Sequence, residues 1–316
     1  MNQVKKVRWV LAHEPIDLFL RAANRFAEEI AKTTGGALDI EVMTLSQYSD
    51  RYADGRVVTK HELLDLMESG EIEMSQMYTT TLGKFSKDMF ALDMPFLFRD
   101  HKHAEMVLEG HIGQSLMEGL SQSSNIKGLA FTYSGGYRMI VANKAIRTVE
   151  DFKGLKIRIA KSPVAEDVLS AVGAIPVPIE IEELNEAIGQ KIVDGGESTY
   201  PRYYSMKQNE CVRVINDTQH SLFLTSILVS KTFWNTLSSE LQTVFSKAAV
   251  VAANLERVES VADIVVVQNK CKEDGIEVVA LNSIEQTKFK NAARSVYEKY
   301  ETYFSNNLIK NIVETH

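Results

Sequence analysis

The sequence lacks the short motifs by which several enzyme classes are recognised. In its 316 residues no Gly-x-Gly-x-x-Gly follows a predicted strand, and no phosphate-binding Gly-x-x-x-x-Gly-Lys-Ser/Thr loop occurs. The Gly-x-Ser-x-Gly nucleophile turn and the zinc-binding His-Glu-x-x-His pattern are missing too. These absences favour a binding protein over an enzyme of those classes.

Cysteine is scarce, with only Cys211 and Cys271. Their number and separation match no metal-binding pattern. Among the seven histidines, His101 and His103 lie close in sequence, but no carboxylate or cysteine accompanies them at metal-site spacing. We therefore expect no metal and no cofactor. Two separate thiols are the expected state of the cysteines, with a single disulfide as the alternative.

Long apolar runs and basic clusters are also lacking. No window approaches the roughly 20 apolar residues of a membrane span. The net charge is −7 and the sequence pI is about 5.6, which argues against nucleic acid as a partner. Residues 1–7 lead into a strand-like run without the apolar core of a signal peptide. The protein is then either cytoplasmic or an exported protein whose signal is absent from this sequence.

The length and the pattern that is present predict two α/β domains. With 45% hydrophobic and 24% charged residues, the chain has the composition of a soluble globular protein. Strands alternate with helices, which is typical of mainly parallel sheets. The predicted strands are 7–12, 38–42, 72–77, 126–132, 138–142, 155–159, 212–215, 225–229 and 277–280. The predicted helices are 17–33, 60–69, 101–119, 162–172, 182–190, about 239–274 and about 283–303.

No low-complexity linker separates the two domains, so we expect the chain to pass between the lobes more than once. We predict lobe I from residues 1–128 and 212–256, and lobe II from residues 129–211 and 257–316. After Ser239 apolar residues recur without proline or glycine until Gly275. A helix of that length measures about 50 Å and should span both lobes.

Two arginines stand out because each is flanked by apolar, strand-forming residues. Arg138 follows Gly135-Gly136-Tyr137, and Arg158 lies in Gly154-Leu155-Lys156-Ile157-Arg158-Ile159. A guanidinium fixed on a rigid element is well matched to a carboxylate, which it can grip by two parallel hydrogen bonds. The sequence therefore predicts a small organic anion as the ligand.

An ordered set of short stretches runs along nearly the whole chain. The stretches are Phe26-Ala27-Glu28-Glu29-Ile30 with Thr34-Gly35-Gly36, Asp93-Met94-Pro95-Phe96-Leu97-Phe98, residues 150–158, Gly173-Ala174-Ile175-Pro176-Val177-Pro178, Glu183-Leu184, Ala187-Ile188 and Val193-Asp194-Gly195-Gly196-Glu197. Together they resemble the solute-binding component of a TRAP transporter, the DctP-like family.

The resemblance implies a fold and a function. Such proteins are periplasmic and have a two-lobed fold like that of periplasmic binding proteins. They capture an organic acid in the cleft between the lobes, close by a hinge motion and deliver the acid to a separate membrane permease. They are not enzymes. Two alternatives stay open: a ligand-sensing domain for a signalling partner, and a cytoplasmic enzyme acting on a carboxylate.

The resemblance also implies site residues. Arg158 would be the principal carboxylate clamp and Arg138 a second donor. Ser198 falls where the family commonly has Asn, and Gly196 where Gln is usual. A hydroxyl is shorter than a carboxamide and offers one donor instead of two, which argues for a ligand other than the usual sugar acids. The further wall positions are His13, Glu14, Tyr78, Lys161, Ser162 and Ile181.

Several of these residues have a purely structural alternative. Arg158 could form a salt bridge within one domain, and Arg138 a domain-stabilising ion pair. Tyr78 could be a core ring. We expect His220 to be a locally satisfied histidine, and Gly195-Gly196 to form a tight bend where the backbone approaches a ligand or a partner strand. C4-dicarboxylates, uronates, aldonates, keto acids and aromatic carboxylates all fit two arginines.

Overall fold

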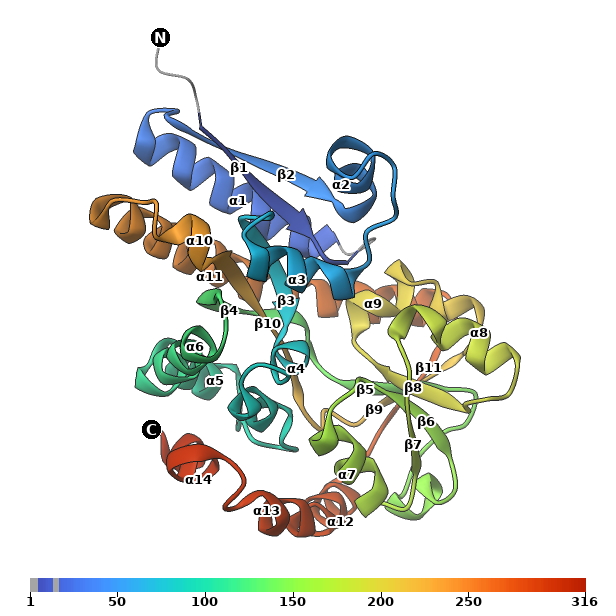
Figure 1. Cartoon of the computed structure of the whole chain (residues 1–316). Helices are drawn as coiled ribbons and strands as arrows, with labels where there is room; N and C mark the ends of the chain where they lie inside the picture. The colour runs from blue at the N-terminus through green and yellow to red at the C-terminus, as the bar shows by residue number, and fades with distance from the viewer. Residues whose placement is uncertain (1–4, 14–16) are drawn as a thin grey trace. The chain divides into compact units, whose positions relative to one another are not determined.

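The computed structural model describes residues 5–13 and 17–316, which form two compact units (Figure 1). Unit 1 holds the chain up to Tyr78, residues 108–132 and residues 225–259. Unit 2 holds residues 79–107, 133–224 and 260–316. Each unit is thus assembled from separate stretches of sequence.

Unit 1 is built on a sheet with the strand order β2-β1-β3-β10-β4. Its strands are β1 (Lys5–Leu11), β2 (Leu38–Thr44), β3 (Met74–Tyr78), β4 (Ile126–Tyr137) and β10 (Leu222–Ser230). Strand β1 runs parallel to β2 and β3, whereas β3 runs antiparallel to β10. The helices of this unit are α1 (Asp17–Thr34), α2 (Leu45–Tyr52), α3 (Lys60–Ser69), α6 (His111–Ser123) and α10 (Lys231–Trp234).

Local sequence signals set these elements. Helix α3 begins after Thr59, whose hydroxyl accepts from the backbone of Glu62 while the Glu62 side chain accepts from the Thr59 backbone. It ends at Gly70, which is left-handed with φ 86°. Helix α1 buries one apolar face, and its Phe26 ring lies 5.1 Å from Trp9 of β1. Caps and apolar periodicity therefore account for where these helices begin, end and pack.

Unit 2 is built on a second sheet, with the order β11-β9-β5-β8-β6-β7. Its strands are β5 (Met139–Ala142), β6 (Lys156–Ile159), β7 (Ile175–Pro178), β8 (Gly195–Ser198), β9 (Val214–Asp217) and β11 (Glu277–Ala280). Its longer helices are α5 (His101–Glu109), α7 (Pro163–Ala171), α8 (Leu184–Gly189), α9 (Tyr200–Ser205), α12 (Ser283–Ala292), α13 (Arg294–Tyr300) and α14 (Leu308–Glu314). Short helical turns complete it: α4 (Thr79–Leu82), η1 (Lys87–Asp93), η2 (Val149–Phe152), η3 (Ile181–Glu183), η4 (Gln208–Glu210) and η5 (Ser305–Asn307).

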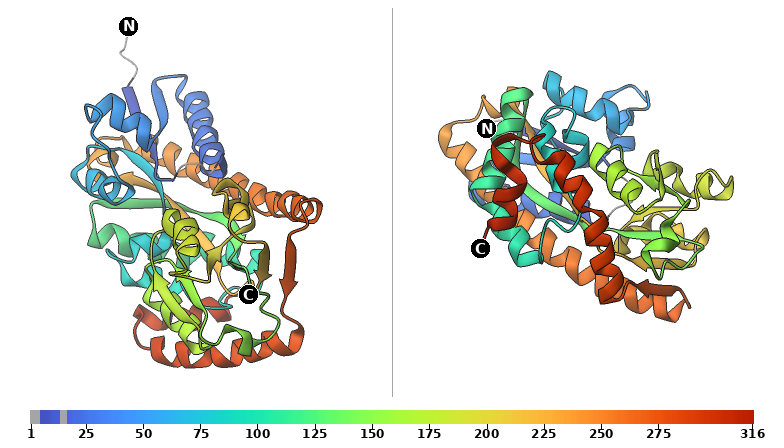
Figure 2. Two further views of the ribbon diagram at one scale, coloured as in Figure 1. Left: turned by 90° about the vertical axis from the view of Figure 1, so that its right-hand side faces the viewer. Right: turned by 90° about the horizontal axis from the view of Figure 1, so that it is seen from below.

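The C-terminal helices, red in Figure 2, belong to unit 2. Helix α13 is tied to α7 because Lys299 and the Tyr300 hydroxyl both bond to Asp167, at 2.7 and 2.8 Å. The end of α14 is held by Arg99, which donates to the carbonyls of Val313 and Thr315 at 2.9 and 2.7 Å. The last helices are thus fixed by charged side chains of the same unit.

The predicted long helix is present as α11 (Ser239–Glu273), and it contributes residues to both units, as do β4 and β10. The predicted lobe boundaries differ from the structure by three or four residues at 129–132 and 257–259, and by longer segments at two places. Residues 79–107 and 212–224 pack with unit 2, although both segments were expected in lobe I. The chain changes unit inside β10, at Leu224–Thr225, and not before β9.

Some predicted elements need correction. The sheets are mixed: most of their described strand pairs are parallel, as predicted, but β5 runs antiparallel to both of its neighbours and β10 runs antiparallel to β3. The helix expected over 101–119 is broken at Gly110 into α5 and α6. The tight bend expected at Gly195-Gly196 is wrong, since both glycines lie in β8 between β5 and β6. The close backbone approach is real, because a Cβ on Gly195 would overlap the Val141 carbonyl oxygen.

The close approach at β8 gives a first prediction. Gly195→Ala should lower the free energy of unfolding by about 2 kcal/mol or more, because the new methyl group meets backbone that cannot move aside. Gly189→Ala is the matched control, since a Cβ there meets nothing within 4 Å. That change at the end of α8 should be neutral or stabilise by up to about 1 kcal/mol. Urea unfolding measures both, and equal effects would contradict this packing.

Candidate functional site

Arg158 sits on β6, in the interior of the unit 2 sheet. Strand β6 runs parallel to β7 and β8, and Arg158 pairs with Val177 and Gly196. A Cβ on Gly196 would lie 3.0 Å from the Arg158 Cβ and 2.8 Å from Leu184. The missing side chain at position 196 therefore leaves room for the stem of the arginine. The strand fixes where the guanidinium starts.

The Arg158 guanidinium is buried but only partly engaged. The residue is 5% exposed, and its Nε donates to the Ile179 carbonyl at 2.8 Å. Within the described residues neither Nη1 nor Nη2 has a hydrogen bond or an ion pair. Burial, with the nearby charges of Arg202 and Arg138, lowers the pKa of Arg158 to about 10, so it stays cationic at neutral pH. It thus presents an open, charged fork.

Arg138 is engaged in a way that Arg158 is not. Its Nη2 lies 3.2 Å from Asp93 Oδ1, and both side chains are 2% exposed. The Thr80 hydroxyl donates to the same carboxylate at 2.9 Å. Burial raises the pKa of Asp93, and Arg138 opposes that rise. The geometry is that of the ion pair named above as the structural alternative for Arg138.

Glu197 on β8 is the second buried carboxylate of this cluster. Its Oε1 lies 2.9 Å from Nε2 of His220, and Nδ1 of His220 lies 2.7 Å from the Thr218 hydroxyl. Burial by itself would raise the pKa of Glu197, but Arg138, His220 and Arg158 outweigh it and lower the pKa from the usual 4.5 to about 2. Both ring nitrogens of His220 therefore have partners, which confirms the prediction for this residue.

A third buried arginine joins the cluster from α9. Arg202 is 2% exposed, and its guanidinium carbon lies 4.9 Å from the centroid of the Phe223 ring. The Arg138 guanidinium lies 4.1 Å from the same ring. Phe223 thus contacts two cations through its π-system. Three buried guanidinium groups lie near one another, which makes this part of unit 2 electropositive.

Ser198 is occupied within unit 2. Its hydroxyl donates to Oε1 of Gln208 at 2.6 Å, and both residues are 1% exposed. The one donor that Ser198 has is therefore spent on a neighbouring side chain. No sequence motif indicated Gln208, which lies in the short helix η4.

The other predicted positions in unit 2 have local roles as well. Lys161 forms an ion pair with Glu180 at 2.9 Å. Ser162 caps α7, since its hydroxyl accepts from the backbone of Ala165 at 3.3 Å. Ile181 is 4% exposed and packs in the core beside β5. Of this group, only Lys161 is mostly exposed.

Two predicted residues belong to unit 1. His13 and Tyr78 are buried, and their ring centroids lie 4.1 Å apart. Phe19 of α1 packs against both rings, at 6.0 Å. The structure thus brings these two together at the ends of β1 and β3. Glu14 lies outside the described residues.

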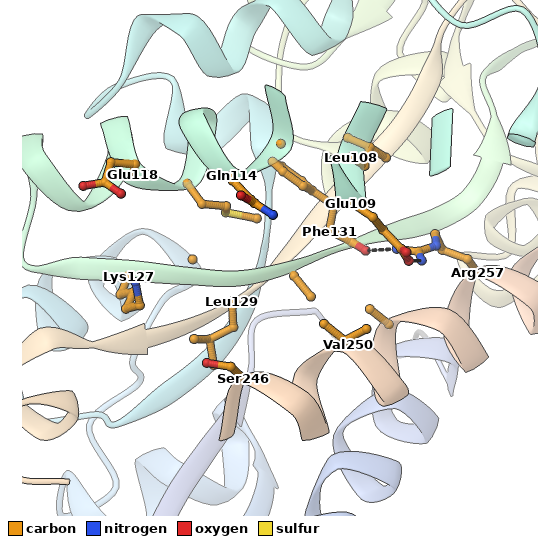
Figure 3. Close-up of a pocket in the computed structure, with 15 residues that line it drawn as sticks. Leu108, Glu109, Gln114, Glu118, Lys127, Leu129, Phe131, Ser246, Val250 and Arg257 are labelled. Atoms are coloured by element: carbon orange, nitrogen blue, oxygen red, sulfur yellow. Dashed lines mark hydrogen bonds and ion pairs between the residues drawn. The ribbon is translucent and has the colours of Figure 1, made fainter. Parts of the chain in front are cut away.

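A cavity of about 480 Å³ in unit 1 offers a contrast (Figure 3). It runs along the edge strand β4, with α6 and α11 as its walls. Its arginine, Arg257, donates to the Phe131 carbonyl at 2.8 Å and pairs with Glu109 and Asn254. Both terminal nitrogens of Arg257 are thus engaged, unlike Nη1 and Nη2 of Arg158.

Metal and disulfide chemistry find no support in the part of the chain that the structure describes. Residues 5–13 and 17–316 contain no group of three or more His, Cys, Asp and Glu that could hold a metal ion. Cys211 and Cys271 are free thiols, as expected. No helix of these residues has the length and apolarity needed to cross a membrane.

Comparison with known proteins decides the family. The family model "Bacterial extracellular solute-binding protein, family 7" matches residues 12–303. This chain belongs to that family. Family 7 proteins are substrate-binding proteins of transporters, so the predicted family and the prediction that the chain is not an enzyme are confirmed.

Curated family 7 relatives align over most of the chain. The C4-dicarboxylate-binding periplasmic protein DctP of Rhodobacter capsulatus is 31% identical over 72% of this chain and 66% of its own length. The C4-dicarboxylate-binding protein DctB of Bacillus subtilis is 26% identical over 93% of this chain and 81% of its own.

Solved TRAP periplasmic solute-binding proteins share the fold. One from a Bradyrhizobium species, in complex with galacturonate, has a TM-score of 0.87 and 28% identity, covering 98% of this chain and 100% of that one. One from Pseudomonas putida with D-glucuronate has 0.86 and 25%, covering 98% and 97%. One from Sulfurospirillum deleyianum with succinate has 0.85 and 25%, covering 99% of both. The two-lobed α/β fold is confirmed.

Sequence reasoning missed several residues of the charged cluster around Arg158. Asp93, Glu197, Arg202 and Gln208 were not proposed as site residues. Asp93 and Glu197 lie inside stretches that carried the family resemblance, so those stretches were the signal. Arg202 and Gln208 had no signal, because their partners are reached only through the fold.

The depressed pKa of Glu197 gives the second prediction. An unfolded glutamate titrates near pH 4.3, so ionised Glu197 stabilises the fold above about that pH. This contribution is lost as the pH falls through about 4 towards 2, and its full size is on the order of 3 kcal/mol. The free energy of unfolding of the wild type should therefore fall more steeply over this range than that of Glu197→Gln.

Urea titrations at a series of pH values measure this difference. Glu298→Gln, at an exposed glutamate with no ion pair among the described residues, is the control and should keep the wild-type slope. Parallel curves for the wild type and Glu197→Gln would contradict the electrostatic role of Glu197.

Proposed function

We propose that this protein captures a small organic acid by its carboxylate, with Arg158 as the clamp, and delivers it to the membrane permease of a TRAP transporter. The single observation that carries this proposal is the open fork of Arg158. The family supports the transport context, and the contacts of Arg158 support its role as the clamp.

The physical support is that the Arg158 guanidinium is buried while its Nη1 and Nη2 have no hydrogen-bond acceptor among the described residues. A buried guanidinium has lost most of its hydration, so a partner that supplies two oxygens in its plane is favoured strongly. Exclusion of water lowers the local dielectric and strengthens that interaction. Arg202 and Arg138 add positive charge nearby, which favours an anion over a neutral guest.

Arg138 has a different part in the proposal. Because Asp93 already occupies one of its terminal nitrogens, we propose that Arg138 contributes to binding mainly by its charge and by stabilising ionised Glu197. Lys161, Ser162 and Ile181 shape the surroundings of Arg158, and Ser198 orients Gln208. These roles are proposals that follow from the contacts above.

His13 and Tyr78 are proposed as ligand contacts contributed by unit 1, together with a hinge motion on binding. Glu14 stays a prediction from the sequence. The relatives are described as binding C4-dicarboxylates, and the solved structures contain galacturonate, D-glucuronate or succinate. These acids form the first panel to test. Since the family is extracellular, we propose that the protein works in the periplasm.

The third prediction concerns the carboxylate itself. In a thermal-shift screen, at least one acid of the panel should raise the melting temperature, because a ligand bound only by the folded state stabilises it. The matched neutral compounds, galactose, glucose and succinamide, should not. Equal shifts from an acid and its neutral partner would contradict a carboxylate clamp.

The fourth prediction concerns Arg158. Arg158→Ala should weaken binding of the best acid by ~2–5 kcal/mol in calorimetry, because the buried charge pair is lost. Arg158→Lys should also bind weakly, since it keeps the charge but not the fork. Arg147→Ala, at an exposed arginine of the same unit that pairs with Glu277, is the control and should bind normally. Unchanged affinity of Arg158→Ala would refute the proposal.

A further inference from the structure

Unit 2 also contains a cavity of about 510 Å³, whose lining does not include Arg158. Its wall comes from the loop before α5, the end of β4, the start of α9, the turn after β9, and helices α11 and α12. None of Arg158, Arg138, Glu197 and Ser198 lines it. The volume is in the range of small-molecule sites.

Four charged residues line this cavity, and two of them are committed to the fold. Asp100 caps α5, since its carboxylate accepts from the backbone of His103 at 2.8 Å. Arg99 uses both terminal nitrogens on the carbonyls of Val313 and Thr315. Both residues keep their charges, but these polar atoms are already hydrogen-bonded within the protein.

The other two charges, Asp217 and Lys290, are opposite in sign, and neither forms an ion pair among the described residues; Lys290 is exposed. Within the described residues Asp217 has no ion pair; its carboxylate accepts from Gln219 Nε2 at 3.2 Å and also interacts with the Tyr200 hydroxyl. Burial raises the pKa of Asp217, as expected for a carboxylate without a cationic partner. The Lys290 ammonium lies 5.4 Å from the Phe96 ring and has no carboxylate partner among the described residues.

The remaining wall is uncharged and includes several aromatic rings among polar and apolar side chains. Phe96, Phe98, Tyr137 and Tyr200 contribute rings. Burial lowers the pKa of His101, so its imidazole is neutral at neutral pH. Aromatic faces favour an ammonium group and also apolar carbon atoms. The cavity therefore offers one negative group, one positive group and several ring faces.

Two wall residues have a strained backbone. Phe96 and Gln219 are left-handed at φ 54° and 48°, a conformation that is uncommon for residues other than glycine. The backbone N–H of Phe96 donates to the His220 carbonyl at 2.8 Å, which helps to hold the strained loop. Such strain gathers at functional sites more than elsewhere. Its presence in two separate loops of one cavity supports a ligand site over a packing gap.

We infer that this cavity binds a small zwitterion, such as an amino acid with an apolar side chain. The ammonium group of the guest meets Asp217 and the surrounding rings, and the carboxylate meets Lys290. The side chain occupies the aromatic wall. This site is separate from the proposed organic-acid site, and its guest needs both charges.

A matched series of three compounds tests the charge requirement. L-phenylalanine carries both groups, 2-phenylethylamine lacks the carboxylate, and 3-phenylpropanoate lacks the ammonium group. Calorimetry on the full chain should show saturable binding of L-phenylalanine and binding of each of the others weaker by about tenfold or more, because each leaves one charge unmet. Equal affinities, or no saturable binding of L-phenylalanine up to about 10 mM, would overturn the inference.

Variants locate the site and separate it from the acid clamp. Asp217→Asn and Lys290→Met should each weaken L-phenylalanine about tenfold or more. Lys153→Met, at an exposed lysine of unit 2 outside the cavity, should not. Arg158→Ala should also leave L-phenylalanine binding intact while it abolishes binding of the organic acid. Melting temperatures show that each variant is folded. Loss with Arg158→Ala but not with Asp217→Asn would contradict a second site.

Discussion

The central constraint is that the carboxylates close to Arg158 are already committed to other cations. Asp93 pairs with Arg138 at 3.2 Å, Glu197 with His220 at 2.9 Å, and Glu180 with Lys161 at 2.9 Å. A nearby carboxylate without a cationic partner would compete with the ligand for the guanidinium of Arg158. The paired acids instead hold the surroundings in place, and the guanidinium keeps two nitrogens for a guest.

Burying these charged groups costs free energy, which explains why rigid strands hold them in position. Buried charges lose hydration, and a broken buried pair destabilises a protein far more than an exposed one. The sheet therefore supplies rigid starting points: Arg158 on β6, Glu197 on β8, and Arg138 at the start of β5. Phe223 adds a ring against which Arg138 and Arg202 both pack. The pairing of the other buried charges thus keeps this cluster ordered, and it also leaves Nη1 and Nη2 of Arg158 available to a ligand.

Much of the fold followed from the sequence. Helix α3 was predicted at its observed bounds, and the structure shows why: a capping box and a left-handed glycine mark its ends. Helix α11 was predicted because no proline or glycine interrupts its apolar pattern. Arg158 was found because apolar neighbours place it on a strand. The resemblance then named the family, which the family match and the solved structures confirm.

The rest depended on contacts that sequence order hides. Asp93 and Arg138 are 45 positions apart, and nothing local joins them. Strand β8 contains two glycines, which propensity reads as a turn, yet the narrow space between β5 and β6 requires them. Ser198 could be recognised as a departure from the family pattern, but Gln208, which takes its hydroxyl, could not. The predicted lobe boundary was wrong at β10, because the residues of a strand do not show at which position the chain passes from one unit to the other.

The most direct test is a crystal structure of the protein with galacturonate or another acid that binds it. The account predicts a carboxylate with its two oxygens about 2.7–3.2 Å from Nη1 and Nη2 of Arg158, while Asp93 stays on Arg138. A carboxylate held elsewhere, with Arg158 paired to a protein acid, would contradict it.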